Sequence, residues 1–367
     1  MMDRFIAGRD STQRGVALIT ALLVIALVTA AAVAMASRQQ LDIRRTANTL
    51  QRDQAYVYAE GAEIMARAVL AKDDPSKDHK EEDWGKSGVT IPLQGGLLTG
   101  TLEDVQGRFN LNNVMKGTAV SLPDVERLKR LLQILKAKST GEDVWKSAEP
   151  GDLANAVRDW IDPDSNVDGG AEDSDYLQKE RPYRAANAPM ASTSELLLVR
   201  GFTPAIYREV APYVTALPEH TKINVNTAKL DVLRTLDPDL TCIVVAKLGR
   251  EEDGSAVDSA SVSTKAKPVV FGTPDEFLLT AGCQFPGFAQ QPKNNAGAPP
   301  ATPATPAPTG SALEKPEDVL SVNTNYFQVN AYAEVGPEDH RVKVKLYSVL
   351  QRKAGKIATI SRAQGFE

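Results

Sequence analysis

The most restrictive feature of the sequence is an uncharged stretch near its start, residues 16–37. At about 1.5 Å per helical residue this stretch reaches roughly 33 Å, which is enough to cross a hydrocarbon core of about 30 Å. A secretory signal has a shorter apolar region followed by a small-residue cleavage site. Here Arg38 ends the run without a turn signal. The sequence therefore predicts a membrane span that is kept, with a charged leader before it.

The segment after the span continues in a helical pattern. Residues 39–71 contain no proline and one glycine, and Gln54 interrupts an otherwise apolar face. We predict one continuous helix over 16–71, roughly 80 Å long, with a lipid-soluble first half and an amphipathic second half. An ordinary anchor followed by a stalk is the simplest alternative. The apolar or small residues of the face recur at spacings of four and three: Ile43, Ala47, Leu50, Val57, Gly61, Ile64 and Ala68.

A glycine separates the charged leader from the apolar run, in the order Arg14, Gly15, Val16. This junction resembles the leaders of type IV pilins and their secretion relatives, which a membrane peptidase cuts after the glycine. The resemblance implies that Val16 begins the mature chain. Most such subunits carry a glutamate at the fifth mature position, which is Thr20 here. The absence of that acid is characteristic of the K minor pseudopilins of type II secretion.

Composition limits the classes of function. The chain has 367 residues, 42% of them hydrophobic and 24% charged, which is enough for two domains beyond the helix. The net charge is −5, and no run is rich in Lys or Arg, so composition argues against a nucleic-acid partner. Three histidines without metal-ligand spacing do not predict a zinc site. No nucleophile elbow, zinc-protease pair or phosphate loop occurs, so we expect no enzyme.

The two cysteines, Cys242 and Cys283, lie well beyond the span. If the positive charge of the leader stays inside, the bulk of the chain lies outside the cytoplasm, where disulfides persist. We predict a bridge between them, which would close a loop of about 40 residues and contribute roughly 3–4 kcal/mol. Two unpaired buried thiols are the alternative.

Strand-like and helix-like segments follow one another in a definite order. Short alternating pieces occupy 89–111, with Gly95 and Gly96 as a hairpin turn, and alternation returns after residue 325. Strands therefore bracket a helical middle, which predicts an α+β fold in which a long N-terminal helix packs on an antiparallel sheet and a helical domain is inserted. The helix-like segments are 121–136, 151–160, 192–199, 203–214 and 227–236.

These patterns divide the chain into six parts. The leader is 1–15 and the span is 16–37, followed by the amphipathic helix and first strands at 38–114. The inserted, mostly helical domain is 115–288. A Pro- and Ala-rich flexible segment covers 289–316, and the C-terminal strands cover 317–367.

An acidic loop, residues 159–176, is the densest chemical feature. Asp164, Asn166, Asp168 and Gly169 match the start of an EF-hand loop, and Asp175 stands at its twelfth position, where a glutamate is normal. The residues after the loop do not form a second amphipathic helix, so we do not predict an EF-hand.

Seven carboxylates within 17 residues repel one another unless they are solvated or neutralised. Calcium accepts six to eight oxygens in flexible geometry, and adjacent glycines let the loop curl around it. A solvated loop is the alternative, and general acid–base chemistry has no nearby histidine to support it. We predict one or two calcium ions held by the loop, with these candidate ligands: Asp159, Asp162, Asp164, Asn166, Asp168, Glu172, Asp173 and Asp175.

Several ordered blocks together resemble the general secretion pathway K proteins, the large minor pseudopilins of type II secretion. They are "GVALITALLVIALV", "RQQLDIRRTANTL", "QGRFNLNN", "DWID" with "GAEDSDY", "PYRAAN" with the following "SEL", and "INVNTA". The resemblance implies a pilin-like domain interrupted by a large helical domain, with calcium near the acidic loop.

The resemblance also implies a place and partners. The chain would span the bacterial inner membrane once, with its bulk in the periplasm, after cleavage by the prepilin peptidase. It would join the minor pseudopilins I and J at the tip of the major pseudopilin filament, initiating or capping a structure that exports folded proteins across the outer membrane. In such filaments the fifth-position acid pairs with a neighbouring N-terminal amine, and an unpaired charge there costs several kcal/mol. Thr20 brings no such charge, which suits a cap.

A DNA-binding module is the rival interpretation. "INVNTAKLDVLRTL" resembles the helix-hairpin-helix repeats of DNA-uptake proteins, "FNLNNV" is a weaker echo, and "GTPDEFLLTAG" could begin another unit. The continuation "DPDLTC" is acidic and lacks the glycine of such hairpins. A membrane-anchored DNA-binding protein is therefore the alternative, and a structural helix pair is favoured.

Overall fold

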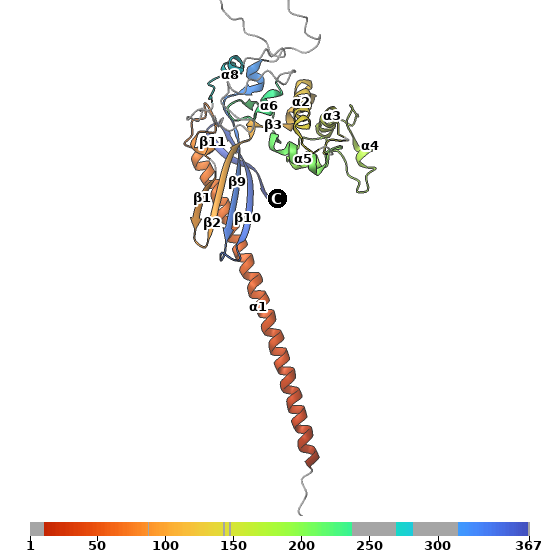
Figure 1. Cartoon of the computed structure of the whole chain (residues 1–367), viewed down its shortest axis with the longest axis vertical. Coiled ribbons are helices and arrows are strands. Elements are labelled where there is room, and N and C mark those ends of the chain that lie inside the picture. Colours follow the sequence, from red (N-terminus) through yellow and green to blue (C-terminus); the bar gives the residue numbers. More distant parts are fainter. Residues whose placement is uncertain are drawn as a thin grey trace, which may run out of the picture.

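A single helix dominates the computed structural model, which describes residues 11–86, 88–141, 144–146, 148–236, 269–281 and 315–365. Helix α1 (Ser11–Leu70) projects far from the body of the molecule, and its second half lies along a sheet (Figure 1). Its segment from Val16 onward is long and apolar enough to cross a membrane. The predicted continuous helix is confirmed.

The sheet joins strands from the two ends of the chain. All its pairs are antiparallel, and β2 lies beside β9, so that segments more than 200 residues apart are neighbours (Figure 1). The predicted hairpin turn is confirmed, with Gly95 at a φ of 75°. In sheet order the strands are β1 (Val89–Leu93), β2 (Gly96–Asp104), β9 (Tyr326–Val335), β10 (Val342–Lys353) and β11 (Lys356–Gln364).

Helix α1 packs on the sheet through an alanine face. Small side chains let the helix lie close to the strands, and they meet Leu98, Ala333 and Leu346 there. The buried face consists of Ala55, Ala59, Ala62, Ala66 and Leu70.

The apolar stripe that the sequence marks is a different face of α1. At about 100° per residue it lies roughly opposite the alanines, and Val57 and Ile64 are 60% and 64% exposed. Periodicity identified an apolar face correctly, but the sheet covers the other one.

A buried carboxylate also fixes α1 to the sheet. Glu63 accepts hydrogen bonds from Ser348, Thr359 and Arg362, and from Arg67 one turn along α1. Burial raises the pKa of Glu63, but these four donors outweigh it and lower the pKa to about 2. The carboxylate therefore stays ionised and pins α1 against β10 and β11.

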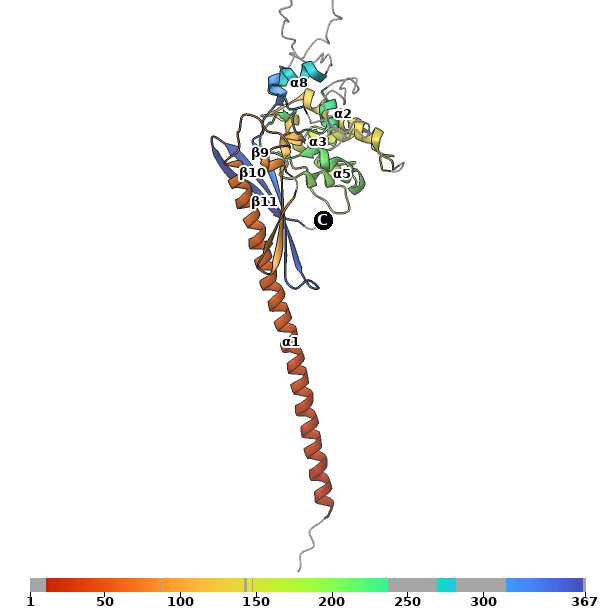
Figure 2. The same cartoon turned by 60° about the vertical axis from the view of Figure 1, so that its left-hand side comes forward.

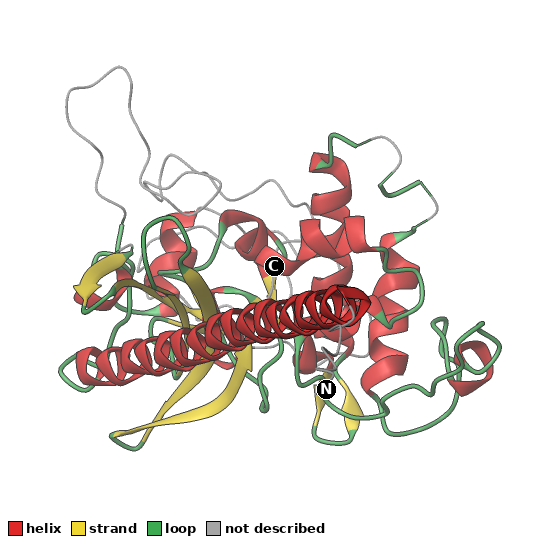
Figure 3. Cartoon of the chain, turned by 90° about the horizontal axis from the view of Figure 1, so that it is seen from below, coloured by secondary structure: helices red, strands yellow, loops and turns green. Residues whose placement is uncertain are grey.

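Two helical units lie at the end of the sheet farthest from the apolar first half of α1 (Figures 1 and 2). Seen from below, α1 crosses in front of both the strands and these helices (Figure 3). The first unit, residues 109–217, has its own apolar core. Its elements are β3 (Phe109–Asn110), β4 (Met115–Lys116), β5 (Ala119–Val120), α2 (Leu122–Lys138), α3 (Pro150–Ile161), α4 (Asp173–Tyr176), α5 (Pro204–Val210) and β6 (Val214–Thr215).

The second unit comprises residues 223–236, 269–281 and 315–322 and has a separate core. Its elements are β7 (Ile223–Asn224), α6 (Leu230–Arg234), α8 (Pro274–Ala281), α9 (Pro316–Val319) and β8 (Leu320–Ser321). Short 3₁₀ turns complete the chain at η1 (Asp83–Gly85), η2 (Val105–Gly107), η3 (Leu111–Val114), η4 (Thr193–Leu197) and η5 (Ala211–Tyr213).

The structure confirms two of the five predicted helices and shortens or changes the other three. Helices α2 and α3 confirm the predictions over 121–136 and 151–160. The helix predicted over 203–214 ends earlier, since Pro212 stands within the 3₁₀ turn η5 and a short strand follows. The prediction over 192–199 is a 3₁₀ turn, and that over 227–236 shortens to α6. Cys242, Cys283 and residues 289–314 of the predicted Pro-rich segment lie outside the described residues, and α9 begins at Pro316, the last residue of that segment.

Both units are held by the same asparagine arrangement. In the first unit, Asn110 accepts from the amide of Asn112, and Asn112 in turn bonds the backbone N–H and C=O of Met190 at 2.8 and 2.9 Å. In the second, Asn224 accepts from the amide of Asn226, which bonds the N–H and C=O of Phe271 at 2.8 and 3.1 Å. We call these arrangements the first and second asparagine frames.

The likeness extends to the turn after each clamped residue. Glu195 accepts from the amide of Ala191 at 2.7 Å, and Glu276 accepts from the amide of Gly272 at the same distance. Each frame also closes a parallel two-stranded ladder, β3 with β6 and β7 with β8. The two units are therefore built as a tandem structural repeat.

Candidate functional site

The leader junction lies inside α1. Gly15 and Val16 are both in helical backbone. From Val16 onward the large apolar side chains are exposed, Val16 by 63% and Leu23 by 60%, and none of the 18-residue apolar window is buried. A helix that is apolar on all sides and covered by no other part of the described chain fits a lipid environment.

Thr20, at the fifth position after the junction, satisfies its own hydroxyl. Its Oγ1 donates to the carbonyl oxygen of Ala17 at 3.0 Å. A hydroxyl bonded within the helix carries no unpaired polar group into lipid. Thr20 therefore needs no partner from another chain, unlike a carboxylate at the same place.

The acidic loop follows α3 and is folded around Asp159. That carboxylate is fully buried and accepts from Arg158 and from the backbone amides of Asp168 and Gly170. Gly170 packs so closely that a Cβ there would lie 2.6 Å from the carbonyl oxygen of Asn155. Asp159 thus ties the far side of the loop back to the end of α3.

Two loop carboxylates are buried without side-chain partners. Oδ1 of Asp162 and both carboxyl oxygens of Glu172 have no side-chain donor among the described residues, and only backbone amides at the start of α4 approach Glu172. The two residues are 3% and 2% exposed. Burial and then repulsion from Asp164 and Asp159 raise the pKa of Asp162 to about 6. Burial and then repulsion from Asp162 raise the pKa of Glu172 to about 7. Buried oxygens that lack side-chain donors fit a bound cation, because a cation would supply the missing partner.

The other candidate ligands are placed differently. Asp164, Asn166 and Asp168 lie on the exposed rim of the loop. Asp173 accepts from the backbone amide of Ala185 and pairs with Arg184, while Asp175 pairs with Arg200. The structure therefore buries Asp159, Asp162 and Glu172 near enough for their charges to repel one another, and it leaves the remaining five on the rim or in ion pairs.

A second acidic group converges more tightly. Oxygens of Asp73, Asp78 and Glu82 lie within 4.8 Å of one another. Arg352 donates to both Asp78 and Asp73, and the amide of Thr324 also donates to Asp78. An arginine already occupies the place of a cation, so this group is an ion-pair joint. Sequence reasoning missed it because Arg352 comes from the other end of the chain.

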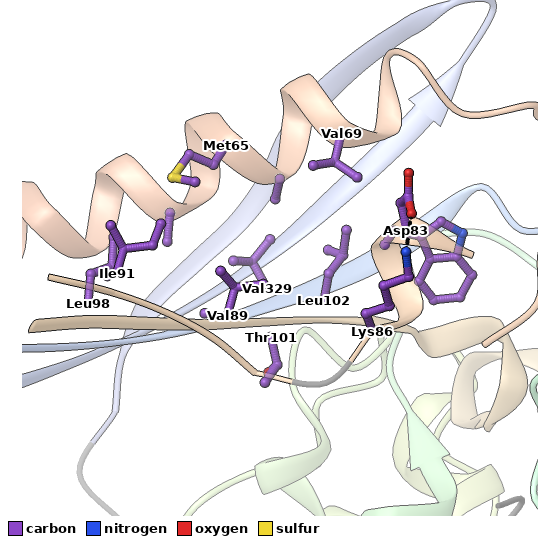
Figure 4. A pocket seen from close by; sticks show the side chains of 14 residues that line it. Met65, Val69, Asp83, Lys86, Val89, Ile91, Leu98, Thr101, Leu102 and Val329 are labelled. Atoms are coloured by element: carbon purple, nitrogen blue, oxygen red, sulfur yellow. Dashed lines mark hydrogen bonds and ion pairs between the residues drawn. The ribbon is translucent and has the colours of Figure 1, made fainter. Parts of the chain in front are cut away.

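An apolar cleft opens between α1 and the β1–β2 hairpin (Figure 4). Met65 and Val69 of α1 lie across from Leu98, Leu102 and Val329 of the strands. The cleft holds about 110 Å³, less than the roughly 300 Å³ or more of a typical small-molecule site. It has room for a side chain of another protein.

The fold defines a class of protein: a pilin-type subunit, with an N-terminal helix long and apolar enough to cross a membrane, whose second half packs on an antiparallel sheet. The family model described as type II secretion system (T2SS), protein K, matches residues 107–219. The type II secretion system protein K of Aeromonas hydrophila is 31% identical over 366 residues, covering 96% of this chain and 97% of that one. The chain belongs to the type II secretion system protein K family and is a minor pseudopilin.

Other relatives agree. The type II secretion system protein K of Pseudomonas aeruginosa is 40% identical over 254 residues, covering 65% of this chain and 73% of that one. A chain of the crystal structure of the GspK-GspI-GspJ complex from enterotoxigenic Escherichia coli has the same fold, with a TM-score of 0.62 and 24% identity. It matches 88% of this chain and 100% of its own length.

These similarities give no support to the DNA-binding alternative. The segment that suggested it contributes the second asparagine frame, in which Asn224 and Asn226 are 0% and 3% exposed and bond other parts of the chain. Their side chains are not available to phosphates.

Proposed function

We propose that this minor pseudopilin forms the tip of the type II secretion pseudopilus together with minor pseudopilins I and J. The observation that carries the proposal is the position of the two helical units, which stand beyond the sheet at the end farthest from the membrane segment (Figures 1 and 2). A subunit stacked farther out would collide with them. Thr20 adds support, because it demands no partner amine from a subunit above.

Two experiments test the tip assignment. Full-length tagged chain, solubilised from membranes that also contain I and J, is expected to recover both. Gold labelling of the helical units on sheared pseudopili is expected at one end only. Labels spread along the shaft would contradict the proposal.

We propose also that the chain is anchored in the bacterial inner membrane with its bulk in the periplasm, after prepilin peptidase cuts between Gly15 and Val16. The apolar, uncovered helix after Gly15 supports an anchor. Gly15→Ala is expected to leave the leader attached and to abolish assembly, whereas an equivalent change at Gly8 should leave both intact. N-terminal sequencing of the mature chain reads the outcome directly.

We propose further that the acidic loop holds calcium, as one or two ions. Asp162 and Glu172 are the inner ligands, because their buried oxygens lack side-chain donors and their charges repel one another. Asp159 shapes the loop, and oxygens from the rim complete the set. Bound calcium would supply positive charge to these carboxylates and so hold the end of α3 to the start of α4. Equilibrium dialysis of the full-length chain against calcium is expected to give one or two ions, and none in Asp162→Asn/Glu172→Gln.

A further inference from the structure

A buried carboxylate at the end of β2 lies where the second helical unit meets the sheet. Asp104 is 9% exposed, and the groups that donate to it are neutral. The amide of Gln106 donates to its Oδ1 at 2.7 Å, and the side chains of Asn224 and Thr227 donate to its Oδ2. A buried carboxylate normally has a cation as its partner, because an unpaired buried charge is costly.

The ion-pair joint beside Asp104 carries an excess of negative charge. Asp73 and Asp78 share one arginine, Arg352. Asp78 is fully buried, and its charge and that of Asp104 repel each other. Asn224 holds the two residues together, since its Nδ2 donates to Asp104 at 2.8 Å and to the carbonyl oxygen of Asp78 at 3.1 Å. Two acidic side chains are therefore held near each other in the interior.

The hydrogen bonds show which of the two carboxylates can take a proton. Both oxygens of Asp78 accept from the guanidinium of Arg352, at 2.7 and 2.6 Å, so a proton there would face a cation. At Asp104 the hydroxyl of Thr227 can turn. If Oδ2 is protonated, Thr227 accepts from it and donates to the carbonyl oxygen of Asn224, 3.5 Å away. The geometry therefore favours a proton on Asp104.

The surroundings of Asp104 also favour and admit a proton. Burial raises the pKa of Asp104, and burial together with the charge of Asp104 raises the pKa of Asp78 to about 7. Because the two groups interact, the raised pKa values belong to the pair. Asp104 lines a pocket of about 430 Å³, through which water can reach it. The other charged groups that line this pocket are Lys80, Lys86, Glu103, Arg108 and Lys229. Those of the ion-pair joint are Asp73, Asp78, His79, Glu82 and Arg352.

We infer that Asp104 is a proton-binding residue whose protonation strengthens the attachment of the second helical unit to the sheet. Asp104 belongs to the sheet, whereas Asn224 and Thr227 belong to the second unit. When the unit separates from the sheet, water solvates Asp104 and screens its repulsion from Asp78. The separated state therefore holds the proton less tightly, so protonation favours the attached state.

The inference goes beyond the proposed function, because acidity would set how firmly the second unit is held. The carboxylate pair has raised pKa values in the attached state and ordinary values, about 4, when it is solvated. The attachment is therefore strongest in acid and weakens as the pH rises from about 4 to about 7.

Hydrogen exchange of the full-length chain in detergent, at about pH 5.5 and about pH 8, tests the inference. Every sample carries Asp162→Asn/Glu172→Gln, so that these carboxylates of the acidic loop do not titrate. The reporters are the backbone amides of Val225 and Asn226, which bond Ser321 and Asn224. After correction for intrinsic exchange rates, we expect their protection to fall about tenfold between the two pH values.

Two variants locate the proton. Asp104→Asn keeps the shape of the side chain and should abolish the fall in protection. Glu219→Gln is the matched control: Glu219 also bonds the sheet, through Tyr326, whose hydroxyl holds the pKa of Glu219 below its ordinary value. Glu219 stays ionised over this range, so its substitution should leave the fall unchanged. If Asp104→Asn does not fold, Asp78→Asn, which removes the facing charge, should reduce the fall.

Three outcomes would overturn the inference. The first is equal protection at both pH values in the chain that keeps Asp104. The second is an undiminished fall in Asp104→Asn, or in Asp78→Asn where that variant replaces it. The third is loss of the fall in Glu219→Gln as well, which would assign the effect to a general loosening of the contact between the second unit and the sheet.

Discussion

The two asparagine frames are alike in their bonds and unlike in what they join. The first frame closes on its own unit and on the segment directly after it: Asn110 accepts from the amide of Leu217 and donates to the carbonyl oxygen of Glu219 and to Thr221. The second frame reaches out of its unit, because Asn224 donates to the carbonyl oxygen of Asp78 and to the carboxylate of Asp104. A repeated scaffold thus serves two purposes.

The first frame supports the acidic loop, whereas the second connects the helical units to the sheet. The first unit carries the acidic loop between α3 and α4, so its frame stabilises the elements that present the carboxylates. The second frame is tied to Asp104 at the end of β2, to which Thr227 also donates, and through Asp78 to Arg352 of β10. Disturbing the first frame should affect the loop, and disturbing the second should affect how the helical units sit on the sheet.

The largest expected effect comes from removing either inner asparagine. Asn112→Ala and Asn226→Ala each leave buried backbone groups of Met190 or Phe271 without partners. Each should lower the free energy of unfolding by about 3–5 kcal/mol, since an unpaired buried polar group costs roughly 1–3 kcal/mol. Chemical denaturation of the full-length chain in detergent measures this. Asn48→Ala, on the exposed surface of α1, is the control.

Equal losses would confirm that the frames are equivalent in strength. A loss confined to Asn112→Ala would break the comparison and mean that the second frame is supported mainly by its ties to the sheet.

Calcium should distinguish the two units. A ligand at 100 times its Kd stabilises the folded state by about 2.7 kcal/mol, and the proposed ligands all belong to the first unit. We expect calcium to raise the melting temperature of the full-length chain and chelator to reverse the rise. Asp162→Asn/Glu172→Gln should abolish the response, whereas Asp275→Asn/Glu276→Gln in the second unit should preserve it. Equal melting temperatures with calcium and with chelator would contradict the proposed calcium site.

The sequence predicted some of this arrangement and could not predict the rest. The span was predictable because lipid requires an uncharged run of fixed length. The packing face of α1 was not, since periodicity reports that a face is apolar without saying whether this chain or another covers it. Ile43 and Val57 marked the face that this chain leaves open, while the smaller Ala55 and Ala59 met the sheet.

The acidic loop was predictable as a cluster of charge but not as a geometry. Only the fold shows that Asp162 and Glu172 are buried without side-chain donors while Asp173 and Asp175 meet arginines. The frames were visible as two echoing motifs, yet their partners are distant in sequence: Asn112 bonds a residue 78 positions away, and Asn226 one 45 positions away. The local sequence pattern does not show which distant residues these side chains bond.

Acidity should also act on the first unit when calcium is absent. The pKa values of Asp162 and Glu172 are raised to about 6 and about 7 in the folded chain, from about 4 in an unfolded one. The folded state therefore binds more protons between those values, so its stability falls as pH rises from about 4 to 7.

One pKa unit equals about 1.4 kcal/mol. Because charge on Asp162 contributes to the raised pKa of Glu172, the two shifts do not simply add, and we expect a decline of roughly 1–2 kcal/mol in chelator. Calcium should make the stability less dependent on pH, and Asp162→Asn/Glu172→Gln should abolish the decline. A decline of the same size in that variant would assign the effect to groups outside the loop.

The smallest expected effects come from the caps that follow the clamped residues, and they test the repeat most finely. Ser192 accepts from the amide of Ser194, and Thr273 accepts from the amide of Glu276. Ser192→Ala and Thr273→Ala should each lower the free energy of unfolding by about 1 kcal/mol, which is the usual value of a side-chain cap. Keeping the hydroxyl, with Ser192→Thr or Thr273→Ser, should preserve most of the stability.

Because the first cap stands in the unit that carries the acidic loop, Ser192→Ala should also weaken the calcium response slightly, and Thr273→Ala should not. If both substitutions weaken the calcium response equally, the two units unfold as one cooperative body. The two frames would then differ in the residues that they join but not in their effect on the stability of the acidic loop.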